Sequence, residues 1–238
     1  MSNKIYVFGD SVLKGVVLDE QYGKYVVDAP LDACALSKLA GQELVNRSTF
    51  GATIIRAKRV IERTLKRKED CGVAVLEFGG NDCNFDWAAV SNNPQADHQP
   101  ATDPDEFAKI YEEIVRDLQA QGVQVVVANL PPIDSEYYLD YLVDSGLDRQ
   151  SLLSFLGDVG RISRFQELYS NISERVAQKT GALLVDLRSR FLRLQNYRDH
   201  ICRDGLHPSP AGHQVIYESL VDFIRSPDAQ GIIQGINA

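Results

Sequence analysis

Residues 4–11 read KIYVFGDS, a short apolar run that leads through a glycine into an aspartate and a serine. Continuous apolar runs of this length are typical of strands that are covered on both faces of a parallel sheet. Gly9 permits a tight turn directly after the run, and Ser11 then opens the next segment. The pattern predicts a strand over 4–8 whose carboxyl end presents a serine hydroxyl at the edge of a sheet.

Similar apolar runs recur along the chain and alternate with segments of helical periodicity. We predict further strands at 43–46, 72–78, 123–128 and 182–186, of which the first has the weakest pattern. We predict helices at 34–42, 53–68, 107–121, 165–180 and 211–224, two of which end at a glycine, Gly122 and Gly181. Strands that alternate with helices indicate βαβ units, and hence an α/β fold in which helices cover both faces of a parallel sheet.

Two longer segments, 83–103 and 135–163, interrupt this alternation. Both follow the carboxyl ends of predicted strands, which is the edge where open α/β sheets bind ligands. Long loops of this kind are usually functional or disordered, and the second is rich enough in leucine and tyrosine to form short helices. We therefore expect one domain over 1–238 with two insertions above the site. Their aromatic side chains could line a substrate pocket or pack in a core: Phe85, Trp87, Tyr137, Tyr138 and Tyr141.

The composition argues against several classes of partner. The formal net charge is -8, with 25 basic and 33 acidic residues, which disfavours nucleic acid or an anionic membrane as the main partner. The chain has no run of about 18 apolar residues, so no membrane span is expected. Residues 1–4 show no signal-peptide pattern, which makes the cytoplasm the expected location. The oligomeric state is left open.

The cysteines and histidines show no metal-ligand spacing. The four cysteines lie far apart in the sequence and are expected to be free thiols: Cys34, Cys71, Cys83 and Cys202. No cluster of histidine, cysteine and aspartate has the spacing of a common metal site, so neither a metal nor another cofactor is required. The expected ligand is a small organic molecule.

A possible nucleophile and a possible base lie near opposite ends of the chain. Ser11 follows the first predicted strand, where its hydroxyl could attack a substrate and its N–H would face an incoming anion. Alternatively, Asp10 or Ser11 only caps a helix. Near the C-terminus, Asp204 precedes His207 by three residues, so that its carboxylate can fold back onto the imidazole and fix its tautomer. The alternative there is a surface histidine beside a helix start.

Two further groups could supply hydrogen-bond donors. In the segment 46–53, Gly51 allows close approach of the backbone to a ligand and leaves its N–H unobstructed. In the segment 79–82, the side-chain amide of Asn81 is a neutral donor suited to a developing oxyanion. The alternatives are an ordinary turn capped by Thr53, and a flexible turn with Asn81 in the left-handed conformation.

In this order, the four groups resemble the sequence blocks of the SGNH (GDSL-type) hydrolases. The resemblance runs from residue 9 to residue 207, with Gly15 completing the first block. It implies a three-layer α/β/α sandwich, flavodoxin-like, with a five-stranded parallel sheet. It also implies Ser11 as nucleophile, His207 as general base and then acid, and Asp204 as the residue that orients His207. The implied oxyanion hole is the Ser11 N–H, the Gly51 N–H and the Asn81 side chain.

The chain is therefore expected to be a serine esterase that works through an acyl-serine intermediate. Short-chain acyl esters are the expected substrates, and O-acetyl groups on sugars are included because Trp87 could stack on a sugar face. Asp10, Phe85, Trp87, Tyr137 and Tyr138 are the candidate substrate-binding residues. The same residues leave open a thioesterase, a lysophospholipase, an acyltransferase and, in a different class, a non-catalytic ligand-binding module. A nucleotide site is disfavoured because no G-x-G-x-x-G follows the first strand.

Overall fold

A computed structural model describes residues 4–29, 31–66 and 70–237 of the chain. Its centre is a five-stranded sheet of strand order β4-β1-β5-β6-β7, in which every pairing is parallel. The strands are β1 (Lys4–Phe8), β4 (Glu43–Asn46), β5 (Val73–Leu76), β6 (Gln124–Ala128) and β7 (Leu183–Val185). All five predicted strands are confirmed, the last three being shorter than expected. The expected absence of a signal peptide was drawn from residues 1–4, and residues 1–3 lie outside the described residues.

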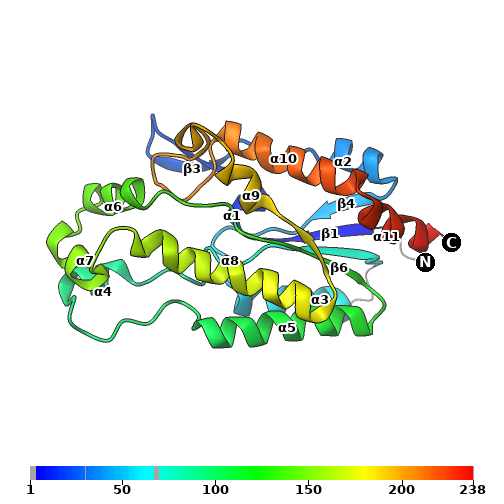
Figure 1. Cartoon of the computed structure of the whole chain (residues 1–238), viewed down its shortest axis with the longest axis horizontal. Coiled ribbons are helices and arrows are strands. Elements are labelled where there is room, and N and C mark those ends of the chain that lie inside the picture. Colours follow the sequence, from blue (N-terminus) through cyan, green and yellow to red (C-terminus); the bar gives the residue numbers. More distant parts are fainter. Residues whose placement is uncertain (1–3, 30, 67–69, 238) are drawn as a thin grey trace.

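Helices cover both faces of this sheet (Figure 1). One layer contains α3 (Ile54–Lys66), α5 (Pro104–Ala120) and α8 (Arg161–Thr180), and the other contains α2 (Ala33–Ala40), α9 (Leu187–Leu192), α10 (Pro210–Arg225) and α11 (Pro227–Asn237). Alternate residues of β1 face opposite layers, since Tyr6 and Phe8 pack in one apolar core while Ile5 and Val7 pack in the other. The expected three-layer α/β/α sandwich is confirmed.

The helix predictions are confirmed with small shifts at the ends. Helix α5 begins earlier than predicted, at Pro104, because Asp103 caps it and proline suits the first helical position. Helix α8 begins four residues before the predicted 165 and ends as expected at Gly181, which adopts the left-handed conformation (φ 71°). The predicted end of the helix over 53–68 includes residues 67 and 68, which lie outside the described residues. Helices α9 and α11 were not predicted.

A small hairpin was also not predicted. After the single-turn helix α1 (Ser11–Lys14), Gly15 adopts a positive φ of 83° and the chain enters β2 (Val16–Asp19) and then β3 (Lys24–Val27). These strands pair with each other in antiparallel fashion and do not join the main sheet. Figure 1 shows β3 near the same end of the molecule as α6.

The two insertions form a cap at the end of the molecule opposite the termini (Figure 1). The second contributes α6 (Ser135–Asp144) and α7 (Arg149–Leu156), which confirms the short helices predicted there. The first contributes α4 (Trp87–Asn92), which was not predicted. The cap has an apolar core of its own, which includes Trp87, Val90, Tyr138 and Leu152. A 3-10 helix over Tyr197–His200 leads from α9 toward the last sequence group. None of the helices in the described residues is both long and apolar enough to span a bilayer.

Candidate active site

Ser11, His207 and Asp204 form a continuous hydrogen-bonded relay. The distance from His207 Nε2 to Ser11 Oγ is 2.9 Å, and that from His207 Nδ1 to Asp204 Oδ2 is 2.6 Å. Asp204 is fully buried, and its Oδ1 also accepts from the backbone N–H groups of Leu206 and His207. Burial alone would raise the pKa of Asp204, but the hydrogen bond and charge of His207 outweigh it and lower that pKa. The relay therefore carries its negative charge at the buried end, away from the serine.

The loop that carries His207 is shaped by short backbone contacts. Ile201 and Pro208 form an isolated antiparallel bridge, and the Cys202 N–H donates to the His207 carbonyl at 2.8 Å. Gly205 has a φ of 72°, and a Cβ on it would lie 2.4 Å from the carbonyl oxygen of Asp134. No other residue fits there without moving the backbone, because both the conformation and the space require glycine. The loop is thus held against the start of α6.

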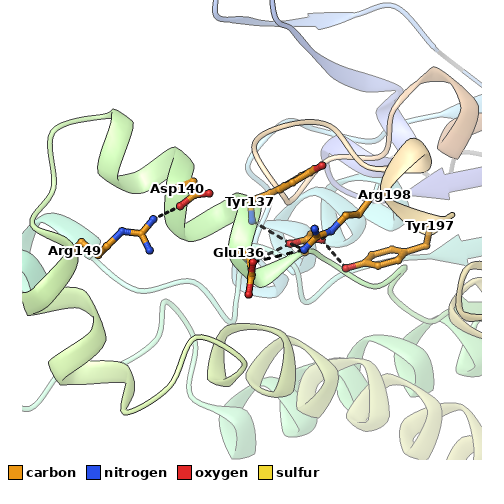
Figure 2. Close-up of polar contacts among 7 residues, drawn as sticks. Glu136, Tyr137, Asp140, Arg149, Tyr197 and Arg198 are labelled. Atoms are coloured by element: carbon orange, nitrogen blue, oxygen red, sulfur yellow. Dashed lines mark hydrogen bonds and ion pairs between the residues drawn. The ribbon is translucent and has the colours of Figure 1, made fainter.

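Asp134 fixes this junction between the catalytic loop and the cap. Its side chain is 1% exposed and caps α6 by accepting from the N–H groups of Glu136 and Tyr137. It also accepts from the Tyr197 hydroxyl at 2.7 Å and from Arg198 Nε at 2.6 Å. Figure 2 shows Arg198 and Tyr197 reaching toward the first turn of α6, with Arg149 and Asp140 forming a separate pair farther along the cap. Burial opposes ionisation of Asp134, but these donors lower its pKa.

We expect Arg198→Ala to lower the free energy of unfolding by about 1.5–3 kcal/mol, the range for a hydrogen bond to a charged group. Arg149→Ala is the matched control, because its partner Asp140 is exposed and surface pairs contribute only about 0–1 kcal/mol. Urea denaturation of both variants measures the difference. A folded-state pKa below the ordinary 3.8 means that the stabilisation exists above pH 3.8 and is lost as the pH falls through the lower folded-state value. Equal stability losses in the two variants at neutral pH would contradict this assignment.

The two predicted donors lie in different surroundings. Asn81 lines the cavity next to Ser11, and its Nδ2 donates to Asp10 Oδ2 at 2.8 Å and to the Ala52 carbonyl at 3.2 Å. Gly51 is exposed and has a φ of 66° in the turn before α3, but it is not among the residues that line this cavity. Asp82 holds this turn against β5, because its carboxylate accepts from the Ile54 N–H at 2.9 and 3.1 Å. Burial raises the pKa of Asp82 to about 6.

A pair of buried carboxyl groups, Asp10 and Glu77, lies next to Ser11. Asp10 Oδ1 caps α1 through the Val12 N–H, and the Asp10 N–H points to Glu77 Oε2 at 3.5 Å. Burial raises the pKa of both groups, and the nearby Asp10 raises that of Glu77 further, well above its usual range. Glu77 is therefore the weaker acid of the two. Glu77 was not singled out from the sequence, although an acid within the apolar run 72–78 was a signal that could have identified it.

A mostly apolar cavity opens beside Ser11 and His207. It encloses about 90 Å³. Its lining includes the following residues from the main domain and the cap: Asp10, Ser11, Glu77, Asn81, Asn84, Phe85, Trp87, Leu130, Ile133, Tyr138, Leu156, Phe165 and His207. Phe85 packs against Trp87, with ring centroids 5.5 Å apart. The indole N–H of Trp87 and the hydroxyl of Tyr138 both donate to Asn84 Oδ1, at 2.7 and 2.9 Å.

The predicted aromatic residues are therefore divided. Phe85, Trp87 and Tyr138 line the cavity, as does Asp10. Tyr137 does not line it, because its ring lies 4.8 Å from each of the guanidinium groups of Arg198 and Arg203, in a separate polar pocket. Successive residues of a helix are rotated by about 100°, which directs two adjacent tyrosines of α6 to different sides. Within the described ranges, no group of three or more histidine, cysteine or acidic side chains could hold a metal ion.

Comparison with known proteins gives one family match over most of the chain. A model of the GDSL-like lipase/acylhydrolase family matches residues 7–215, which include all four sequence groups. Among curated proteins, a GDSL esterase/lipase of Arabidopsis thaliana is 25% identical over 232 residues, covering 94% of this chain and 87% of that protein. A second from the same organism, the GDSL esterase/lipase CPRD49, is 20% identical over 237 residues, covering 94% and 80%.

Solved structures with the same fold include a lipase/acylhydrolase and an esterase. A lipase/acylhydrolase from Enterococcus faecalis has a TM-score of 0.63 and 19% identity, with coverage of 93% of this chain and 95% of that one. A catalytic mutant of an acetylxylan esterase from Geobacillus stearothermophilus has a TM-score of 0.62 and 17% identity, with coverage of 94% of each chain. At these identities the likeness establishes the fold.

Proposed function

Because the chain belongs to the GDSL-like lipase/acylhydrolase family, whose members hydrolyse ester bonds, we propose that it is a serine esterase acting on short-chain acyl esters through an acyl-serine intermediate. The observation that carries this proposal is the relay Asp204–His207–Ser11, with steps of 2.6 and 2.9 Å, which opens on a small apolar cavity. The nucleophile, the base and a place for the acyl group thus lie together in one site.

In the proposed reaction, Ser11 Oγ attacks the ester carbonyl while His207 Nε2 accepts the serine proton. The negative Asp204 stabilises the imidazolium that results. The backbone N–H groups of Leu206 and His207 donate to the Asp204 carboxylate and hold that carboxylate in place. His207 then donates the proton to the departing alcohol, leaving an acyl-serine. Water, activated by the same histidine, attacks the acyl group and releases the acid. A better nucleophile than water at this second step would give an acyltransferase.

The proposed oxyanion hole contains the N–H groups of Ser11 and Gly51 and the side chain of Asn81. In the structure both hydrogens of the Asn81 amide have acceptors, Asp10 Oδ2 and the Ala52 carbonyl. Donation to an oxyanion therefore requires Asn81 to exchange one of these contacts. The Ala52 contact, at 3.2 Å, is longer than the 2.8 Å contact to Asp10, so we assign the exchange to Ala52 and the retained, orienting contact to Asp10.

The cavity supports a short acyl group. Its volume of about 90 Å³ is well below the roughly 300–1,000 Å³ of pockets that enclose drug-sized ligands. The polar ends of Trp87 and Tyr138 are both engaged by Asn84, so the walls near them present apolar surface to a ligand. An acyl chain suits these walls, and the alcohol, a sugar included, would then lie outside the cavity.

We expect acetyl to butyryl esters to exceed palmitoyl esters in kcat/KM by at least about tenfold, because a chain longer than the cavity must displace packed cap residues. A series of p-nitrophenyl esters from acetyl to palmitoyl, with acetylated sugars as a second series, measures this preference. In an open acyl groove each added methylene would contribute about 0.8 kcal/mol. A steady rise in kcat/KM to the longest chain would therefore refute the short-chain assignment.

A further inference from the structure

The imidazole of His207 is enclosed by two aromatic rings that the relay itself does not require. The Tyr25 ring lies 4.7 Å from it, centroid to centroid, at an interplanar angle of 50°. The Phe50 ring lies 6.2 Å away and is nearly parallel, at 6°. Tyr25 and Phe50 are themselves 5.5 Å apart, so the three rings contact one another. His207 thus has two aromatic neighbours in addition to its hydrogen-bond partners Ser11 and Asp204.

Tyr25 reaches this position through the β2–β3 hairpin. The register of the hairpin pairs Tyr25 with Leu18, and Tyr25 is the only residue of β3 that is not exposed. The base of the hairpin is fixed, since the N–H groups of Asp28 and Ala29 both donate to the Gly15 carbonyl. A strand that lies outside the main sheet therefore has one partly buried side chain, and that side chain contacts the catalytic histidine.

The hydroxyl of Tyr25 connects the hairpin to the cap. It donates to the Tyr141 hydroxyl of α6 at 3.1 Å. Burial first, then the Tyr141 hydroxyl and the negative Asp204, raise the pKa of Tyr25. The phenol therefore stays protonated and neutral beside the buried carboxylate. The contact joins residues 116 positions apart and brings the hairpin and the cap together at the histidine.

We propose that Tyr25 and Phe50 form an aromatic frame that positions His207 for proton transfer, with Tyr141 fixing the frame to the cap. This inference rests on the proposed role of His207 as the base. The rings restrict rotation of the imidazole away from the orientation in which Nδ1 faces Asp204 and Nε2 faces Ser11. The Tyr25 ring, 4.7 Å away, also favours the imidazolium that forms during attack, since a cation within about 6 Å is attracted to an aromatic ring.

The frame can be tested by separating ring from hydroxyl. Tyr25→Leu removes the ring and is expected to lower kcat about tenfold while KM stays within twofold. A tenfold loss in kcat corresponds to the energy of a partly desolvated cation–aromatic contact. Tyr25→Phe keeps the ring and should lose less than about threefold. Tyr22→Leu is the matched control, because Tyr22 lies in the turn of the same hairpin and is 67% exposed. Phe50→Leu, at a residue 45% exposed, tests the second ring with little risk to folding.

A spectroscopic readout separates positioning from a general structural effect. The Nδ1–H of His207, bonded to Asp204 at 2.6 Å, should give a far-downfield proton resonance in the wild type. We expect Tyr25→Leu to broaden or shift that resonance, and Tyr25→Phe and Tyr22→Leu to retain it. If Tyr25→Leu does not fold, Phe50→Leu must lower kcat at least about threefold and perturb the same resonance.

The outcomes keep the frame and the proposed function distinct. A wild type that turns over esters only with Ser11 intact, together with Tyr25→Leu and Phe50→Leu variants of unchanged kcat and unchanged resonance, overturns the frame alone. A wild type that lacks Ser11-dependent activity overturns the proposed function. Equal losses in Tyr25→Leu and Tyr22→Leu would show that the hairpin acts only through stability, and would also overturn the frame.

Discussion

We expect Ser11→Ala to lower kcat for p-nitrophenyl acetate by about a millionfold, as loss of a triad nucleophile does in other serine hydrolases. Ser11 Oγ is the atom that His207 Nε2 contacts, and no second hydroxyl is hydrogen-bonded to that nitrogen in the described part of the chain. Alanine removes only this hydroxyl, at the first residue of the single-turn helix α1. The melting temperature should therefore stay near that of the wild type.

Ser11→Cys is a useful companion, because it retains a nucleophile of different size and pKa at the same position. We expect it to form an acyl-enzyme with activated esters but to turn over slowly. Activity of Ser11→Ala within about tenfold of wild type would mean that another residue attacks the ester, since no mechanism with Ser11 as nucleophile tolerates its removal.

The second large effect is expected at Asp204. Asparagine in its place would present a donor to His207 Nδ1 and favour the wrong tautomer, a change that costs about ten thousandfold in kcat in a serine protease. Asn81→Ala should cost less, about a hundred- to a thousandfold, because two backbone donors would remain in the oxyanion hole. The order of these two losses follows from the proposed roles, in which Asp204 acts through the base and Asn81 acts on the oxyanion.

Measurement of kcat and of the labelling rate with a fluorophosphonate, with circular dichroism as the folding control, distinguishes the two variants. Asn81→Ala should still be labelled, though more slowly, because Ser11 and His207 are intact. The structure places the other candidate carboxylates elsewhere: Asp82 caps α3, and Asp186 caps α9 through the Ser189 N–H. An Asp204→Asn variant near wild type, with a severe loss at Asp10, Asp82 or Asp186, would show that the orienting acid was assigned wrongly.

The sheet was predictable because each of its strands carries the signal locally. The runs at 5–8 and 125–128 are continuously apolar, and both faces of these strands are in fact covered by helices. The relay could also be anticipated, since Ser11 directly follows a strand and Asp204 lies three residues before His207. A spacing of three residues is a local property, and the structure shows the bond that it allows, at 2.6 Å.

The hairpin and the aromatic frame could not be predicted in this way. Strands β2 (VVLD) and β3 (KYVV) have only four residues each, and β3 is largely exposed, so their short apolar runs do not indicate a separate hairpin. The contact of Tyr25 with His207 depends on how distant segments pack, which a local pattern does not contain. The sequence also could not distinguish the adjacent Tyr137 and Tyr138. The orientation of α6 about its own axis decides which of the two tyrosines lines the cavity.

The central claim is that Ser11 is the nucleophile of an esterase, and covalent labelling tests it most directly. The wild type should react with a fluorophosphonate to give one adduct, which mass spectrometry of the digested protein should locate on Ser11. His207→Ala should react at least about a thousandfold more slowly, because the serine would lack its base. An adduct on a different residue, or no adduct on a folded wild type that still hydrolyses esters, would contradict the account.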